Sequence, residues 1–220
     1  MEPSTDQLIL INKPVGWTSF DVVNKLRNKL KIKKIGHAGT LDPLATGLLI
    51  LCTGKMTKRI DEYQAQEKEY TGKFIIGQST PSHDLETIVT ETKDITHITQ
   101  EAIQLATHKF IGVIQQIPPL HSAINVDGKR AYKLARKGKE VELKAREVSI
   151  LEFEITQIQK PEISFRIVCS KGTYIRSIAR DFGIALGVGA YLTDLCRTRI
   201  GEFKLENATT IEQIHPTLSA

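Results

Sequence analysis

The chain has 220 residues, a length that suits one large domain or two small ones and allows a substantial buried core. Hydrophobic residues make up 40% and charged residues 25% of it, an ordinary balance for a globular protein. No apolar run is long enough to cross a membrane, the N-terminus lacks a basic signal-peptide start, and the three cysteines form no CxxC pair. These features exclude a membrane protein and a secreted disulfide scaffold, and they favour a reduced, intracellular protein.

Positive charge is divided among separate segments. Residues 1–60 carry ten Lys/Arg against four Asp/Glu, and residues 127–149 and 160–204 each carry eight against four. Residues 61–126 are acidic, with four Lys/Arg against nine Asp/Glu. This distribution suits a groove for a polyanion assembled in three dimensions, with phosphate contacts expected from residues 29–34, 129–139 and 197–199. A mildly basic charge is, however, also common among proteins that bind no nucleic acid.

The first part of the chain predicts a strand, a helix and a loop. Residues 8–12 form a short apolar run typical of a buried strand. The stretch 18–30 predicts a helix, with Thr18 as its cap and Asp21 three residues later. Its inward face is expected to hold Phe20, Val23, Leu26 and Leu30. A glycine-rich loop is expected to follow over residues 36–49.

The rest of the chain alternates strands and helices irregularly. In the strand predicted over 68–77, Tyr70, Gly72, Phe74 and Ile76 share one side. Helices are predicted over 99–112, 128–138 and 173–186, and strands over 146–158 and 162–170. Because several strands follow one another as hairpins, the pattern indicates an α+β fold with a mixed sheet.

The loop "GHAGTLDPLATGLL" (36–49) isolates one carboxylate, Asp42, among small and apolar residues. Its glycines do not fit GxGxxG, and "TGKMT" downstream lacks the pattern of a P-loop. An aspartic protease would need a second carboxylate, and a metal site would need more ligands than the nearby His37. Asp42 therefore either caps a helix beginning at Pro43 or is a reactive group on a rigid loop, and one residue could do both.

The same stretch resembles the signature of the TruB family of tRNA pseudouridine synthases. Similar agreement is found in "NKPVGWTS" (12–19), "KEYTGKFIIGQ" (68–78), "CSKGTYIRSIARDFG" (169–183) and "YLTDLCRTRIGEF" (191–203). "GTLDP" separates this chain from sister families, which tend to show "RLD" around the acid. The resemblance extends from about residue 7 to residue 204.

The resemblance implies a pseudouridine synthase fold: an α+β domain with a long mixed sheet, flanking helices and a central active-site cleft. It implies isomerisation of uridine to pseudouridine at position 55, in the T-arm loop of tRNA, without metal or organic cofactor. Residues 1–220 would be a single catalytic domain lacking the C-terminal PUA-type domain of many relatives. We expect a cytoplasmic monomer whose partner is the T-arm stem-loop of tRNA, with no membrane and no guide RNA.

The resemblance also assigns site residues. Asp42 would act at C1′ of the flipped uridine, because cleavage of a glycosidic bond builds positive character there that a carboxylate can stabilise or trap. Arg176 would hold that carboxylate ionised, against the alternative that it faces solvent. Tyr70 would stack on the base and relay a proton, although its alternation with Phe74 also fits a core residue. The remaining assignments are supporting ones: Leu195 packs on the other side of the ring, His37 fills the space left by the flipped base, Lys13 supports the tyrosine, and Asp84 is an acid near the cleft.

Two other functions remain open from the sequence. The chain could be an RNA chaperone that folds tRNA without catalysis, or an enzyme directed by a guide RNA as in dyskerin-type synthases. The presence of Asp42, Tyr70 and Arg176 together favours catalysis over a chaperone alone.

Overall fold

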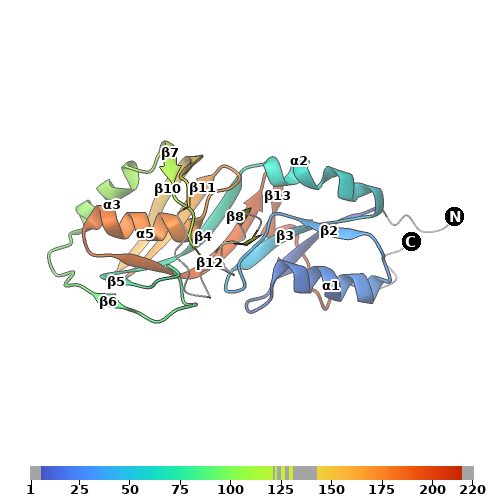
Figure 1. Ribbon diagram of the computed structural model, residues 1–220, viewed down its shortest axis with the longest axis horizontal. Coiled ribbons are helices and arrows are strands. Elements are labelled where there is room, and N and C mark those ends of the chain that lie inside the picture. Colours follow the sequence, from blue (N-terminus) through green and yellow to red (C-terminus); the bar gives the residue numbers. More distant parts are fainter. Residues whose placement is uncertain (1–5, 121, 123–124, 127–128, 131–142, 215–220) are drawn as a thin grey trace. The chain divides into compact units, whose positions relative to one another are not determined.

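The computed structural model describes residues 6–120, 122, 125–126, 129–130 and 143–214 (Figure 1). The chain divides into two compact units, Met1–Thr71 with Asp194–Ala220 and Gly72–Thr193. The described α-helices are α1 (Ser19–Leu30), α2 (Ile60–Ala65), α3 (Gln100–His108) and α5 (Ile175–Leu186). None of these helices is long and apolar enough to span a membrane. The helix predicted over 128–138 lies outside the described residues.

Nine strands form one mixed sheet, in agreement with the predicted fold class. Their hydrogen-bonding order is β1-β3-β12-β4-β11-β10-β7, with β2 paired to β3 and β13 to β12. β12 runs parallel to β3, whereas β1 and β3, β10 and β11, and β7 and β10 are antiparallel. The strands are β1 (Leu8–Lys13), β2 (Ile35–Ala38), β3 (Thr46–Thr53), β4 (Lys68–Ile76), β7 (Gly112–Gln116), β10 (Arg146–Gln159), β11 (Glu162–Cys169), β12 (Ala190–Ile200) and β13 (Phe203–Lys204). Two short ribbons complete the β-structure: β5 (Gln78–Ser79) with β6 (Glu91–Thr92), and β8 (Asn125–Val126) with β9 (Lys129–Arg130).

The first unit is built on both faces of β3. Its apolar run is buried throughout, as expected of a strand covered on both sides. One face packs against α1 and β1, in a cluster of Ile11, Val22, Val23, Leu26, Ile35, Leu49, Leu51, Ile211 and Ile214. The other face packs with α2 and the end of β12, in a cluster of Ala38, Leu48, Ile50, Cys52, Tyr63 and Ile200.

Helix α1 begins where the sequence predicted. The Thr18 hydroxyl accepts the Asp21 N–H at 3.0 Å, and the Asp21 carboxylate accepts the Thr18 N–H at 2.9 Å, which completes a capping box. The predicted inward face is wrong at one position, because Phe20 is 59% exposed and Val22 is buried instead. The apolar stripe of α1 is therefore rotated by part of a turn from the predicted one.

In the second unit, α3 and α5 lie over the sheet strands β4, β10 and β11 (Figure 1). The alternation predicted for β4 is confirmed, since every second residue from Lys68 to Ile76 is buried. Aromatic rings hold the layers together: the Phe182 ring of α5 lies 5.7 Å from Phe74 and 5.6 Å from Phe153, and the Phe74 ring stacks on Phe165 at 4.2 Å.

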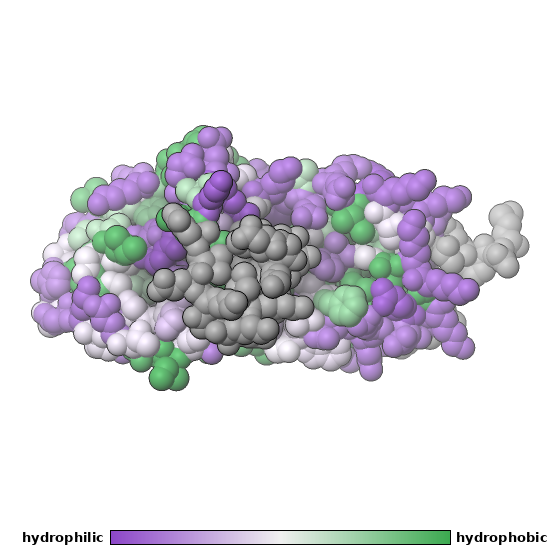
Figure 2. Space-filling model, viewed as in Figure 1, coloured by the Kyte–Doolittle hydropathy of each residue, from purple (hydrophilic) through white to green (hydrophobic). Residues whose placement is uncertain are grey.

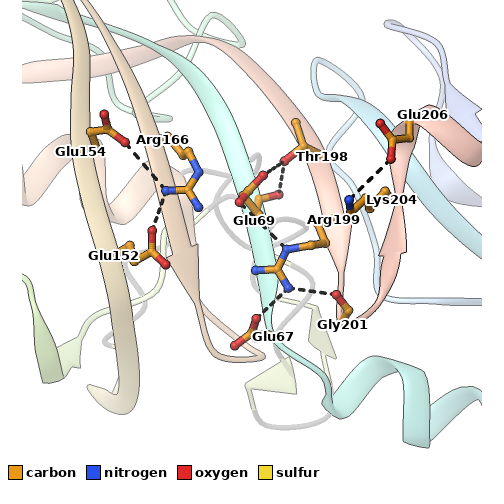
Figure 3. A network of polar contacts seen from close by, with 10 residues as sticks. All are labelled: Glu67, Glu69, Glu152, Glu154, Arg166, Thr198, Arg199, Gly201, Lys204 and Glu206. Atoms are coloured by element: carbon orange, nitrogen blue, oxygen red, sulfur yellow. Dashed lines mark hydrogen bonds and ion pairs between the residues drawn. The ribbon is translucent and has the colours of Figure 1, made fainter.

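Polar contacts between side chains follow the strands in both units (Figure 3). In the first unit, Arg199 pairs with Glu67 at 2.7 Å and with Glu69 at 3.9 Å. In the second unit, Arg166 pairs with Glu152 at 2.5 Å and with Glu154 at 3.8 Å. Because the charge of Arg199 is offset by two carboxylates, it is a weaker candidate for phosphate binding than the sequence predicted.

Candidate active site

Asp42 lies on the loop between β2 and β3, half-buried and followed by an exposed turn. The Ala45 N–H donates to the Asp42 carbonyl at 3.1 Å, so that Asp42 and Pro43 occupy the first two positions of a four-residue turn. The alternative of a helix that begins at Pro43 is therefore wrong. The expectation of one continuous loop over 36–49 is also wrong, because β2 and β3 take up both ends of the motif.

Hydrogen bonds from the segment after β1 hold this loop on both sides of the carboxylate. The buried Ser19 hydroxyl accepts the Leu41 N–H at 2.9 Å and donates to the Leu41 carbonyl at 3.3 Å. The Gly16 N–H donates to the Pro43 carbonyl at 2.8 Å. The residues before and after Asp42 are thus fixed to one neighbouring segment, which leaves the backbone of Asp42 little freedom of position.

Lys13 is buried and also connects the segment after β1 to the Asp42 loop. Its ammonium, with 0% exposure, donates to the carbonyls of Trp17 at 2.7 Å, Pro14 at 2.9 Å and Pro43 at 3.4 Å. Burial lowers the pKa of Lys13 to about 8, and the nearby Asp42 carboxylate opposes that shift. The structure thus gives Lys13 a contact with the Asp42 loop, which sequence reasoning missed; its support of the tyrosine stays a prediction.

Arg197 contacts the backbone on both sides of the Asp42 loop. The guanidinium, 1% exposed, donates to the carbonyls of Leu48 at 2.8 Å, Gly39 at 3.1 Å and Thr40 at 3.5 Å. It therefore joins the chain before Asp42 to the chain after it. The prediction that Arg197 contacts phosphate is wrong, because the sheet encloses its side chain. A signal was present, since Arg197 follows Leu195 by two residues and so shares its face of β12.

Gly47 lets β3 start directly beside β12. Its φ of +102° favours glycine, and a Cβ there would lie 2.6 Å from the Arg197 backbone nitrogen. This close approach allows the parallel pairing of Gly47 with Arg197. The Thr46 hydroxyl donates to the Leu195 carbonyl at 3.4 Å, so Leu195 lies beside the end of the Asp42 loop.

His37 lies on β2, in the same unit as Asp42. Burial, and secondarily the charge of Arg197, lowers the pKa of His37, so the imidazole is neutral at pH 7. Its buried Nδ1 makes no hydrogen bond within the described part of the chain. A neutral, half-buried ring suits contact with a base better than contact with a phosphate.

The second unit brings two predicted site residues together. Arg176, in the first turn of α5 as predicted, lies with its Nε 3.5 Å from Oδ2 of Asp84, and both side chains are buried. The Asp84 carboxylate also accepts the Glu86 N–H at 2.9 Å. Burial and the charges of Arg180 and Arg176 lower the pKa of the adjacent His83 to about 4, so His83 adds no positive charge beside Arg176 at neutral pH. The predicted contact of Arg176 with Asp42 stays a prediction.

Gln116 fixes the start of α5, a role that the sequence did not reveal. It is completely buried at the end of β7, where its amide accepts the Tyr174 N–H at 2.8 Å and donates to the Tyr174 carbonyl at 3.2 Å. The Ser177 hydroxyl adds a bond to the Ile117 carbonyl at 2.8 Å. Because Tyr174 provides no side-chain cap, Gln116 determines where the first turn and its arginine lie.

Tyr70 and Leu195 are buried on β4 and β12, with 8% and 7% exposure. Tyr70 lies on the inward row of β4, as its alternation predicted. Burial of this extent fits both a core tyrosine and one that a base would cover, so its stacking role stays a prediction. Among the described residues, no three His, Cys, Asp or Glu side chains gather as metal ligands would.

Comparison with known proteins identifies the family. Residues 27–175 match the family described as TruB family pseudouridylate synthase (N terminal domain), and residues 176–219 match tRNA pseudouridylate synthase B C-terminal domain. The chain belongs to the TruB family. It is 55% identical over 212 residues to tRNA pseudouridine synthase B of Phocaeicola vulgatus, covering 94% of this chain and 90% of that protein. It is 53% identical over 219 residues to the protein of that name in Flavobacterium johnsoniae, covering 96% of each.

Solved structures share this TruB fold. A crystal structure of a Cbf5-Nop10-Gar1 complex contains a chain that matches with a TM-score of 0.73 and 30% identity. A structure of an H/ACA RNP bound to a substrate RNA containing 2'-deoxyuridine contains one that matches with a TM-score of 0.71 and 28% identity. Both matches cover 94% of this chain but only 53% and 51% of the others, so it spans about half the length of those chains.

Proposed function

We propose that this protein isomerises uridine to pseudouridine at position 55, in the T-arm loop of tRNA. Support comes from its membership of the TruB family and from relatives, more than half identical, that are named tRNA pseudouridine synthase B. The observation that carries the proposal is the rigid presentation of Asp42. Its neighbours Leu41 and Pro43 are tied by Ser19, Gly16 and Lys13.

The chemistry requires one well-placed carboxylate. The C1′–N1 bond of uridine breaks, the uracil turns, and a C1′–C5 bond forms, while the proton on C5 leaves and N1 gains one. Atoms and electrons balance without an oxidant or a co-reactant. Asp42 acts at C1′, where positive character develops as the glycosidic bond breaks. Lys13 and Arg197 hold the loop, and Arg176 is the proposed cationic partner of the carboxylate.

The target uridine must leave the folded loop of the RNA before its C1′ can reach Asp42. Tyr70 and Leu195 then hold the two faces of the uracil, and His37 occupies the space that the base leaves. We assign these three roles by resemblance, and the half-buried, neutral state of His37 supports its part.

Residues 1–220 act as one catalytic domain, in the cytoplasm, as a monomer that needs neither a cofactor nor a guide RNA. The alternatives predict different results in one experiment. An unmodified tRNA transcript labelled with tritium at C5 of uridine releases tritium when pseudouridine forms. We expect release from this RNA with the purified protein alone; dependence on an added guide RNA would contradict the proposal, and tRNA folding without release would favour a chaperone.

Asp42→Asn tests the assigned carboxylate, because it keeps the shape of the side chain and removes its charge. We expect tRNA binding to persist and tritium release to disappear. The exposed Asp61→Asn on α2 serves as the matched control and should keep normal turnover. Appreciable turnover by Asp42→Asn, in a preparation free of host enzyme, would remove Asp42 from this role.

A further inference from the structure

Three large apolar side chains around the Asp42 loop are exposed. Val15 is 60%, Phe20 59% and Leu44 42% exposed. We call these three residues the apolar rim. On the face of the first unit drawn in Figure 2, hydrophilic residues dominate and hydrophobic ones are few, so exposure of this kind is the exception. Grouped apolar surface in water marks a contact site more often than scattered single residues do.

Hydrogen bonds bring the rim residues into one region. Val15 precedes Gly16, whose N–H is bonded to the carbonyl of Pro43, next to Leu44. Phe20 follows Ser19, whose hydroxyl is bonded to Leu41 at 2.9 Å. The segments 15–20 and 41–44 therefore run side by side, with Asp42 between the two points of attachment.

Folding does not explain the exposure of Phe20. Helix α1 is capped by Thr18 and Asp21, and it buries Val22, Val23 and Leu26 in the core. A polar residue at position 20 would satisfy the same helix, because this position faces away from the sheet.

Positive charge continues from the rim along the same segment. Exposed lysines follow Phe20 on the remainder of α1 and the turn after it, at Lys25, Lys31, Lys33 and Lys34. A single-stranded nucleic acid offers the complementary pattern, since its unpaired bases have apolar faces and its backbone carries phosphates. In a duplex, base faces are stacked on one another, and an apolar side chain reaches them only where the bases unstack.

We propose that the apolar rim binds the unpaired bases beside the target nucleotide, with Phe20 as the stacking platform. This inference rests on the proposed function, which places a single-stranded RNA loop at Asp42. It adds a binding surface outside the predicted site residues, and it assigns the rim to substrate affinity rather than to the chemical step.

The test uses a T-arm hairpin RNA with 2-aminopurine next to the target uridine. Phe20→Ser should weaken binding roughly tenfold, within the range for loss of stacking on one base, and should abolish the quenching of 2-aminopurine on binding. Phe20→Trp should retain both affinity and quenching. Ile184→Ser is the matched control, because Ile184 is a 67% exposed aliphatic residue on α5, and it should bind as the wild type does.

Single-turnover rates at saturating RNA should be unchanged in Phe20→Ser, since Asp42 and its ties are intact. Thermal midpoints within a degree or two of wild type would show that the fold is preserved. Equal RNA affinities for Phe20→Ser and Ile184→Ser would overturn the proposed role of the apolar rim, even if the wild type converts uridine normally. Conversely, a wild type that binds through Phe20 but converts no uridine would refute the proposed function and leave the rim in place.

Discussion

Replacement of Arg197 by methionine tests whether a buried cation organises the candidate site. Methionine keeps much of the side-chain volume and removes every donor. The change leaves the Leu48 and Gly39 carbonyls, bonded at 2.8 and 3.1 Å, without those donors, whereas the bond to Thr40 at 3.5 Å is already at the limit. A buried acceptor that loses its donor costs about 1–3 kcal/mol.

Two such losses would amount to roughly 2–6 kcal/mol, reduced because methionine also removes the cost of keeping a cation out of water. We therefore expect the free energy of unfolding to fall by about 2–4 kcal/mol, a large part of the stability of an ordinary domain. Urea unfolding followed by circular dichroism would measure it. Arg197→Lys should lose nearly as much, since one ammonium on a shorter reach cannot bridge Gly39 and Leu48.

Arg199→Met is the matched control on the same strand. Arg199 is paired with Glu67 and Glu69 near the end of β12, where its side chain is partly exposed (Figure 3). Ion pairs of this kind contribute about 0–1 kcal/mol, so this variant should remain close to wild type.

The activity of Arg197→Met should fall more than its tRNA affinity. A misplacement of about 1 Å at a reacting group can cost on the order of a hundredfold in rate. We expect such a loss in single-turnover tritium release, measured at a temperature where the variant is folded, with tRNA binding retained. The reasoning would be refuted by a variant that loses less than about 1 kcal/mol and keeps the wild-type rate.

Two further predictions concern Lys13 and Tyr70. Unfolded chains hold the Lys13 proton up to about pH 10.5 and the folded protein releases it near 8, so the free energy of unfolding should rise between these values relative to Lys13→Met. If the free energies of unfolding of the two proteins change with pH in the same way, the lowered pKa of Lys13 is contradicted. Tyr70→Phe should bind tRNA normally but lose roughly a hundredfold in turnover if the hydroxyl moves a proton, whereas Tyr70→Leu should also lose binding. If Phe keeps wild-type turnover and Leu loses activity only in step with its thermal midpoint, Tyr70 is a core residue.

The sequence by itself determined those features that depend on neighbours along the chain. The cap of α1 at Thr18 needs only Asp21 three residues later, and the alternation of β4 needs only the two-residue period of a strand. The motif around Asp42 likewise indicated the family, which the comparisons confirmed. Local pattern was insufficient at two positions: it left open a helix at Pro43 that does not form, and it predicted an inward Phe20 that is exposed.

Tertiary structure decided which long polar side chains hold the site. Lys13, Arg197 and Gln116 are all bonded to backbone groups, and two of these partners lie 149 and 58 residues away in the chain. Every residue carries the same carbonyl and nearly every one the same N–H, so a sequence cannot mark which of them will receive a bond. Arg197 was predicted to contact phosphate for this reason. A basic segment contains the same residues whether its arginine is exposed to solvent or is buried beside β3.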